Sequence, residues 1–342
     1  MTSFAKQSPS WTTPSALSNA LMSSLDSASG VVVAELVRDG HVESLHHGIV
    51  AVVDSAGELL LERGNSGVPV YPRSTLKPLQ TLALLGTGVD LTPLEIALST
   101  ASHCGSIAHR DAIEAFLQRH GLGPENLQCP VDWPLGASER ARMLASLGAP
   151  SRLAMNCSGK HAGFLAATIH SGWDHTTYLE AHHPLQELIL ATIEAWSGET
   201  VAFSSTDGCG APLHALTTRG LARAIASLAS GKTPEARALL DAVAGNAWAL
   251  DGEGRANTIT IQTIGGIAKI GAEGLVVIGT PEGVAVAVKI VDGSMRATTP
   301  VALEALVRVG AIESTQRDHI LAGMADPVMG GDRIIGGLRV QI

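Results

Sequence analysis

The chain contains few aromatic residues, few cysteines and few charges, and each scarcity excludes a class of protein. Aromatic residues make up 3% of the 342 residues and charged residues 16%, whereas hydrophobic residues make up 45%. Aliphatic side chains must therefore form the core, and a chain this apolar is not intrinsically disordered. Four single cysteines without a C-x-x-C pair exclude a disulfide framework. A net charge of −9 argues against a nucleic-acid or anionic-membrane partner.

Long apolar runs are also absent, so the sequence predicts no transmembrane helix. The first residues have neither the basic start nor the apolar core of a signal peptide, and we expect a cytoplasmic location. Ser and Thr interrupt residues 1–28 throughout, which favours a mobile tail. Residues 29–342 contain no clear linker, and we interpret them as a single domain.

Strand patterns at both ends of the chain and helix patterns between them predict an α+β fold. Apolar runs separated by turns predict three strands over 31–63 and two strands over 275–293. Helix patterns occupy most of 92–248, beginning with a capping box at Thr92–Glu95, and further helices are expected within 300–325. The two β blocks are expected to pair in one antiparallel sheet beside a mainly helical middle.

Lysine is scarce, with six residues against 17 arginines, and Lys77, Lys160 and Lys289 lie in apolar or Gly/Ser-rich surroundings. Ser74 and Lys77 form an S-x-x-K pattern at the start of a predicted helix, so their side chains share one face. Burial or a neighbouring cation such as Arg73 would lower the pKa of Lys77 and allow it to deprotonate Ser74. The alternative is a capping serine followed by a surface lysine.

The segment 99–109 contains several hydroxyls and two histidines around a Gly turn. It suits substrate binding or a second nucleophile, and helix capping by Ser102 and Ser106 is the alternative. Lys289 ends an alternating strand immediately before a turn. Serine penicillin-recognising enzymes carry a strand-end lysine beside the active site, but their K-T-G triplet is missing here, and a solvated lysine is equally compatible.

Two Gly-rich turns each contain one cysteine. Cys157, Cys209 and Asp207 are suitable ligands for a tetrahedral metal such as zinc, and Lys160 or His161 could complete the set. A lysine ligand must be neutral, but coordination itself lowers its pKa. Because no C-x-x-C or H-x-x-x-H pair is present, two buried free thiols remain the alternative.

Five segments, which follow one another in a fixed order, resemble the asparaginase II family of the rhizobial, thermolabile type. They are RSTLKP, SHCGSIAH, NCSGKHAGFL, TDGCGAP and KIVDGSMR. The resemblance covers nearly the whole chain after residue 30. The T-G-G-T-I start of the better-known bacterial asparaginases and the self-cleavage site of the plant type are both missing. The resemblance implies a fold like that of serine β-lactamases and glutaminases, a homodimer, and hydrolysis of L-asparagine to L-aspartate and ammonia.

The resemblance also assigns roles to individual residues. It implies two catalytic Ser–Lys tandems, Ser74 with Lys77 and Ser106 with Lys289. It implies one zinc ion per chain and a role for His161 in substrate interaction. We expect Arg73 and His103 to contact the substrate as well. The zinc residues are Cys157, Lys160 and Cys209 with Asp207 beside them, and the substrate-binding residues are Arg73, His103 and His161.

Two other functions remain open at this point. A glutaminase or another β-lactamase-like acyl hydrolase would use the same Ser–Lys chemistry, and one methylene group in a pocket changes the binding free energy by only ~1–3 kcal/mol. A non-enzymatic protein that binds zinc or a metabolite belongs to a different class. It would bind its ligand tightly without releasing ammonia.

Overall fold

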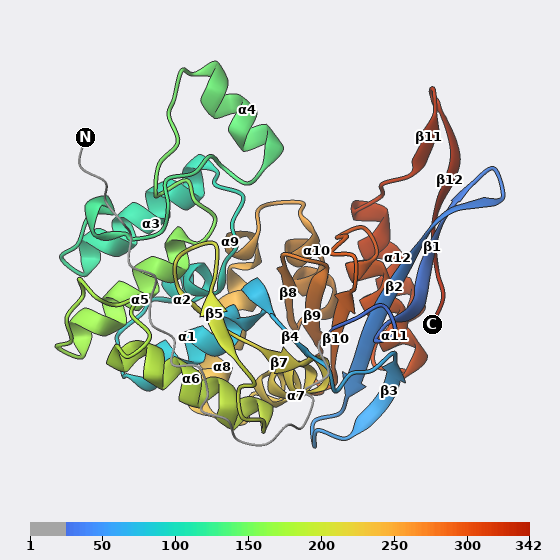
Figure 1. Ribbon diagram of the computed structural model, residues 1–342. Coiled ribbons are helices and arrows are strands. Elements are labelled where there is room, and N and C mark those ends of the chain that lie inside the picture. The colour runs from blue at the N-terminus through green and yellow to red at the C-terminus, as the bar shows by residue number, and fades with distance from the viewer. Residues whose placement is uncertain (1–24) are drawn as a thin grey trace, which may run out of the picture.

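The computed structural model describes residues 25–342, and both ends of this range contribute to one eight-stranded antiparallel sheet (Figure 1). The strand order is β11-β12-β1-β2-β10-β9-β8, and β3 pairs with β2. The strands are β1 Val31–Arg38, β2 His41–Val53, β3 Leu59–Arg63, β8 Ile267–Gly271, β9 Leu275–Gly279, β10 Ala285–Ile290, β11 Val328–Gly330 and β12 Arg333–Val340. The chain therefore returns from its helical middle to lay β10 against β2, as the sequence predicts.

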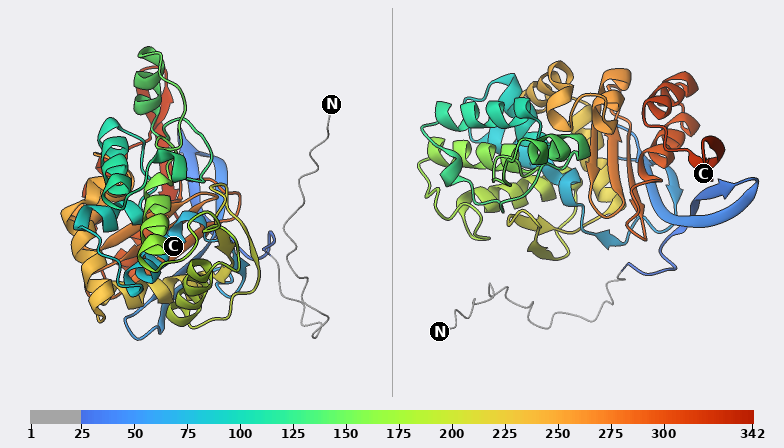
Figure 2. Two further views of the ribbon diagram at one scale, coloured as in Figure 1. Left: turned by 90° about the vertical axis from the view of Figure 1, so that its left-hand side faces the viewer. Right: turned by 90° about the horizontal axis from the view of Figure 1, so that it is seen from above.

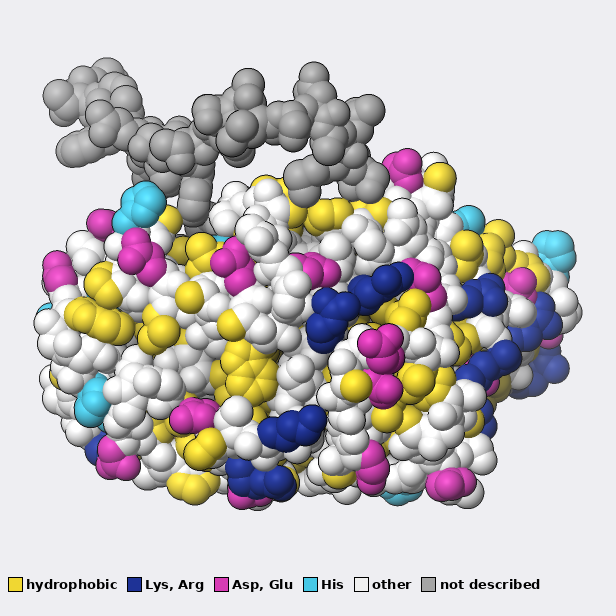
Figure 3. Space-filling model, turned by 90° about the horizontal axis from the view of Figure 1, so that it is seen from below, with side chains coloured by type: hydrophobic (Ala, Val, Ile, Leu, Met, Phe, Trp, Pro, Cys, Tyr) yellow, Lys and Arg dark blue, Asp and Glu magenta, His cyan; other side chains and the backbone are white. Residues whose placement is uncertain are grey.

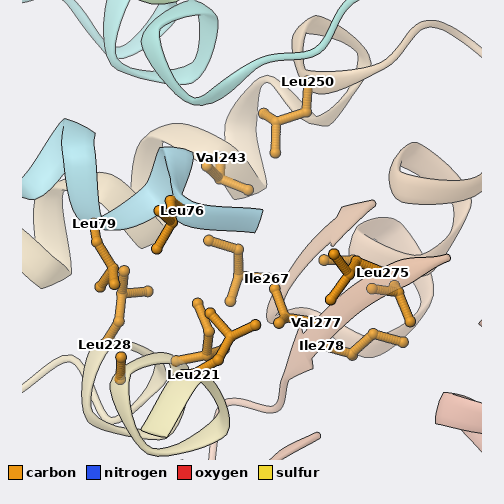
Figure 4. Close-up of a cluster of buried hydrophobic side chains, with 14 of the residues drawn as sticks. Leu76, Leu79, Leu221, Leu228, Val243, Leu250, Ile267, Leu275, Val277 and Ile278 are labelled. Atoms are coloured by element: carbon orange, nitrogen blue, oxygen red, sulfur yellow. The ribbon is translucent and has the colours of Figure 1, made fainter. Parts of the chain in front are cut away.

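The central strands are buried on both faces, which explains their continuous apolar sequences. Every residue of β9 and β10 is buried, and α7 (Thr218–Ala229) and α11 (Thr298–Arg308) both pack on these two strands. Figure 4 shows part of this core, with Leu221 and Leu228 of α7 facing Ile267, Val277 and Ile278 of the sheet. Aliphatic side chains supply nearly all of it, as the low aromatic content requires.

The helical part lies beside the sheet part, as the view from above in Figure 2 shows. Its centre is α1, which packs against α2, α5, α6 and α8. The helices not yet given are α1 Lys77–Gly86, α2 Pro93–Thr100, α3 Ile107–Arg119, α4 Ala137–Ala145, α5 Ser158–His170, α6 Pro184–Ser197, α8 Pro234–Gly245, α9 Ala247–Leu250, α10 Ala256–Ile264 and α12 Ser314–Gly323. Two small sheets, β4 (Pro69–Val70) with β7 (Leu216–Thr217) and β5 (Ser204–Thr206) with β6 (Pro212–His214), complete the set.

The predicted α+β class is confirmed, and so is the capping box at Thr92 and Glu95. Sequence patterns missed β8, α10 and the hairpin of β11 and β12. Glycines interrupt the apolar pattern of β12, and a lysine interrupts that of β8. Residues 1–24 of the predicted tail lie outside the described residues, and the single-domain interpretation of 29–342 stays a prediction.

Within residues 25–342, no helix has the length and apolar character needed to cross a membrane. The face seen from below in Figure 3 is mostly neutral, with acidic and basic side chains interspersed over it.

A short 3₁₀ helix, η1 (Arg73–Leu76), connects β4 to α1 and packs against the edge strand β8. The packing is close: a Cβ added at Gly271 of β8 would lie 2.9 Å from the carbonyl oxygen of Pro72 and 3.0 Å from Thr75. A glycine at this position therefore allows the start of α1 to approach the sheet edge. This contact brings the S-x-x-K segment beside a strand that is nearly 200 residues away in the sequence.

Candidate active site

A cavity of about 480 Å³ opens where η1, β8 and the start of α10 meet. Its walls include Ser74 from η1 and Ser102 from the loop that follows α2. Asn156, Asp251, Arg255 and Asn257 supply further polar side chains to the wall. The cavity thus gathers hydroxyl, amide and charged groups from four separate parts of the chain.

Ser102 lies between two buried lysines. The Nζ atoms of Lys77 and Lys269 each lie 2.9 Å from the Oγ atom of Ser102. Lys77 comes from the first turn of α1 and Lys269 from the middle of β8, and both side chains are almost fully buried. The backbone N–H of Ser102 donates to the carbonyl oxygen of Leu250, the last residue of α9, and this bond fixes the serine loop to that helix.

The hydrogen-bond partners of the two amines differ. Lys77 Nζ also donates to the carbonyl oxygen of Ala101 at 2.5 Å and lies 3.1 Å from Cys157 Sγ, so it has three partners, as a protonated ammonium requires. Lys269 Nζ has one further partner, the carbonyl oxygen of Ile270 at 2.8 Å. Burial, and then the positive charge of Lys77, lower the pKa of Lys269 to about 7. A neutral Lys269 can accept the proton of Ser102 while it donates to Ile270.

Ser74 lies in the same cavity wall, one turn before Lys77. Within residues 25–342, however, the amine of Lys77 makes no hydrogen bond to the Ser74 hydroxyl and turns toward Ser102 instead. Arg73, directly before Ser74, has a positive φ of 54°, which is strained for a side chain of this size. Its Nε donates to Asp207 Oδ1 at 2.7 Å, and this ion pair holds the strained turn that presents Ser74.

The structure does not bring Ser106 and Lys289 together, so the predicted pairing of these two residues as a second Ser–Lys tandem is wrong. Ser106 is the N-cap of α3, and its Oγ lies 2.7 Å from His109 Nδ1. Lys289 Nζ donates to the carbonyl oxygens of Glu273 and Ile290, in the wall of a different cavity. The physical reason is sheet order: β8, not β10, forms the edge that faces the cavity, so the lysine of β8 reaches the serine loop.

The sequence analysis therefore overlooked Lys269. It included Ser102 in a loop suited to substrate binding or a second nucleophile, without assigning Ser102 itself a catalytic role. The available signal for Lys269 was a single lysine in the apolar strand Ile267–Gly271, which is unusual in a strand without alternation. For Ser102 and Ser106, separated by four residues, no sequence signal ranks one above the other.

The predicted zinc residues form a cluster behind the cavity wall. Lys160 Nζ lies 3.0 Å from Cys209 Sγ, and the thiols of Cys157 and Cys209 shift each other's pKa in opposite directions. The hydrogen bond from Cys157, and then the charge of Lys160, hold the pKa of Cys209 well below the ordinary thiol value, against the effect of burial. Burial alone would lower the pKa of Lys160, but the two thiols raise it above the ordinary lysine value. Asp207 Oδ2 lies 3.6 Å from Cys209 Sγ.

Two thiols and an amine in one buried cluster are a suitable donor set for zinc, which prefers sulfur and nitrogen ligands. No group of three or more His, Cys, Asp and Glu side chains between residues 25 and 342 is arranged to hold a metal ion. The third donor of this cluster is a lysine, which would have to lose its proton to bind a metal.

The three predicted substrate-binding residues do not line the cavity around Ser102. His103 is buried, with its Nε2 2.9 Å from Ser158 Oγ, and burial, followed by His109 and Lys77, holds its pKa well below the ordinary value. His161 is buried as well, with its Nδ1 2.7 Å from the Tyr178 hydroxyl. Arg73 lies in the wall of the cavity that contains Lys289.

The comparison with protein families supplies the classification. A family model described as L-asparaginase II matches residues 34–340. The chain belongs to the L-asparaginase II family. As a member, it is an asparaginase-type amidohydrolase that acts on a small molecule. No curated protein matches this chain.

Two solved structures are similar to this L-asparaginase II family member, each with a TM-score of 0.39. One is a β-lactamase from Mycobacterium bovis, with 14% identity over 77% of this chain and 94% of that one. The other is EstCE1, a hydrolase with promiscuous acyltransferase activity, with 12% identity over 85% of this chain and 93% of that one. These values are too low to match individual side chains, so no residue role follows from them.

Proposed function

We propose that this protein hydrolyses the side-chain amide of L-asparagine through an acyl-enzyme formed on a cavity serine. The observation that carries the proposal is the hydroxyl of Ser102 in the cavity wall, which lies 2.9 Å from each of two buried lysine amines. Amide hydrolysis needs an activated nucleophile, a base and an acid for the departing amine. Family membership supplies the amide, and the two lysines supply the proton transfers.

The proposed reaction begins with a neutral Lys269, whose pKa of about 7 leaves a large neutral fraction at neutral pH. Lys269 takes the proton of Ser102 as the serine oxygen attacks the amide carbon. The resulting ammonium then protonates the leaving nitrogen, which departs as ammonia. Lys269 next takes a proton from water, the hydroxide attacks the ester, and L-aspartate leaves as Ser102 regains its proton.

Lys77 has a different part in this proposal. Its three hydrogen-bond partners favour the protonated form, so its charge stabilises the developing Ser102 alkoxide and keeps Lys269 neutral. Ser74 faces the same cavity and stays the second candidate for the acylated serine, because Lys77 follows it by one helical turn. Acyl-enzyme trapping in Ser74→Ala and Ser102→Ala variants distinguishes the two serines.

We also propose one zinc ion per chain, held by Cys157, Lys160 and Cys209 with Asp207 beside them. When bound, zinc would supply a fixed positive charge near the cavity wall, since Cys157 lies 3.1 Å from the amine of Lys77. Removal of zinc is expected to change KM or stability more than the chemical step, because Ser102 and Lys269 already provide a nucleophile and a base. A homodimer and a cytoplasmic location belong to the same proposal, and they rest on the family resemblance and on composition.

Ammonia release from L-asparagine, L-glutamine and buffer alone tests the proposed function. We expect wild type to release ammonia from L-asparagine and the Ser102→Ala protein to lose that activity. A preference for L-glutamine would indicate a glutaminase, which the same cavity chemistry supports. Ligand binding without ammonia release from any amide would indicate the non-enzymatic alternative.

A further inference from the structure

Two charged side chains line the cavity that contains Ser102, and the proposed reaction uses neither. Asp251 and Arg255 come from the loop between α9 and α10, and all other residues in the wall are neutral. Arg255 Nε donates to Asp251 Oδ1 at 2.6 Å. Asp251 is 6% exposed, whereas the Arg255 side chain is 39% exposed and lines both this cavity and a neighbouring one beside Ser106 and His109.

The hydrogen bonds of Asp251 are directed to the protein. Oδ1 accepts from Arg255, and Oδ2 accepts from the backbone N–H of Asn257 at 3.3 Å, in the first turn of α10. The backbone oxygen of Asp251 accepts from Cys104 N–H at 2.7 Å, and the preceding residue accepts from Ser102 N–H. The loop of Asp251 is thus fixed to the loop of Ser102, and the position of Arg255 relative to the serine is fixed with it.

The guanidinium group of Arg255 has free donors. Within residues 25–342, the bond from Nε to Asp251 is its single side-chain hydrogen bond, so the two terminal amino groups and their four N–H donors are unused. A guanidinium edge with two parallel N–H groups matches a carboxylate in geometry and charge. A neutral amide or an ester offers no such match.

We infer that Arg255 binds the α-carboxylate of the substrate, and that Asp251 positions its guanidinium group. This inference rests on the proposed function and adds the substrate class: free α-amino acids whose side-chain amide reaches Ser102 while their carboxylate contacts Arg255. Substrates in which the α-carboxyl group is blocked, including asparagine within a peptide, are discriminated against. The sequence analysis gave Arg73 as a substrate-binding residue, but Arg73 lines a different cavity.

The test compares L-asparagine with its α-N-methylamide, which lacks the carboxylate and can release ammonia only from the side chain. We expect wild type to hydrolyse L-asparagine with a kcat/KM about 10- to 100-fold higher, as for loss of a hydrogen bond to a charged group. Arg255→Gln is expected to remove this preference, chiefly by raising KM for L-asparagine, and to leave kcat/KM for the methylamide within about threefold. Arg255→Lys should restore part of the preference, because it keeps the charge without the bidentate geometry.

Two further variants separate recognition from a structural role. Arg142→Gln is the matched control, because Arg142 is 77% exposed on α4 and does not line this cavity. Asp251→Asn is expected to raise KM for L-asparagine more than KM for the methylamide, which a general loss of stability would not do. An Arg255→Gln protein that retains the full preference, or that loses both substrates equally, overturns the inference.

A failure of the proposed function can be distinguished from a failure of the Arg255 inference. If wild type releases no ammonia from L-asparagine, the proposed function fails, and calorimetric titration with L-aspartate then tests Arg255 by itself. Weaker L-aspartate binding by Arg255→Gln than by wild type would support the carboxylate site. Equal binding by the two proteins would overturn it.

Discussion

Lys269 and Lys160 are both fully enclosed by protein, yet their surroundings shift their pKa values in opposite directions. Burial, and then the positive charge of Lys77, lower the pKa of Lys269 to about 7. Beside the thiols of Cys209 and Cys157, the pKa of Lys160 rises above the ordinary lysine value in spite of burial. Burial favours the neutral form of both lysines, so the sign of the neighbouring charges decides which of the two becomes a base and which stays a cation.

The largest effect is expected from removing the base. Lys269→Met should lower kcat for ammonia release by several orders of magnitude, because residues that act as one catalytic unit fail together. The same change should raise the melting temperature at pH 6, since it removes a buried amine that is costly to protonate. Steady-state kinetics and thermal unfolding of the same preparation check both effects, and a Lys269→Met protein with near-normal kcat would contradict the assigned base.

A Ser102→Ala variant should lose a comparable part of kcat, and Ser106→Ala provides its matched control. Ser106 caps α3 and contacts His109, so its loss should reduce stability by about 1 kcal/mol and leave turnover largely intact. Burst kinetics and chemical denaturation measure the two proteins. Equal loss of activity in both would restore Ser106 to the catalytic set.

The pH profile tests the charge of Lys269 directly. Activity should rise with pH through an apparent pKa near 7, because only the neutral amine can accept the serine proton. The unfolded chain keeps its proton up to about 10.5, the ordinary lysine value, so between these two values it binds more protons than the folded chain. The contribution of Lys269 to stability therefore rises with pH across this window, and the Lys269→Met protein should lack that rise. A kcat/KM that is flat from pH 6 to 8 would count against a neutral lysine.

A smaller effect is expected at the thiol cluster. Elemental analysis should find one zinc per chain in wild type and none in a Cys157→Ser, Cys209→Ser double variant. Metal loss should raise KM or lower the melting temperature, with kcat reduced far less than in Lys269→Met. Cys129→Ser is a suitable control, because that buried thiol donates to the carbonyl oxygen of Arg152 instead. Wild type without stoichiometric zinc, or a double variant with unchanged KM and melting temperature, would leave Cys157 and Cys209 as buried thiols.

Local sequence was sufficient for much of this protein. Alternating and continuous apolar segments predicted β1, β2, β9 and β10 and their pairing, and Thr92 with Glu95 predicted the start of α2. The S-x-x-K segment was placed at a helix start, where Ser74 and Lys77 indeed lie. These features depend on residues within a few positions of each other, so periodicity and capping chemistry determine them.

Only the tertiary structure decided which serine meets which lysine. Ser102 and Lys269 are 167 residues apart, and they meet because β8 is the edge strand and Gly271 lets η1 pack closely against it. Sheet order is set by the packing of whole strands between α7 and α11, and no short motif encodes it. The charge of a buried lysine is likewise decided by the tertiary structure, because the charged neighbours come from distant segments of the chain. Lys77 is the neighbour of Lys269, and Cys209 is the neighbour of Lys160.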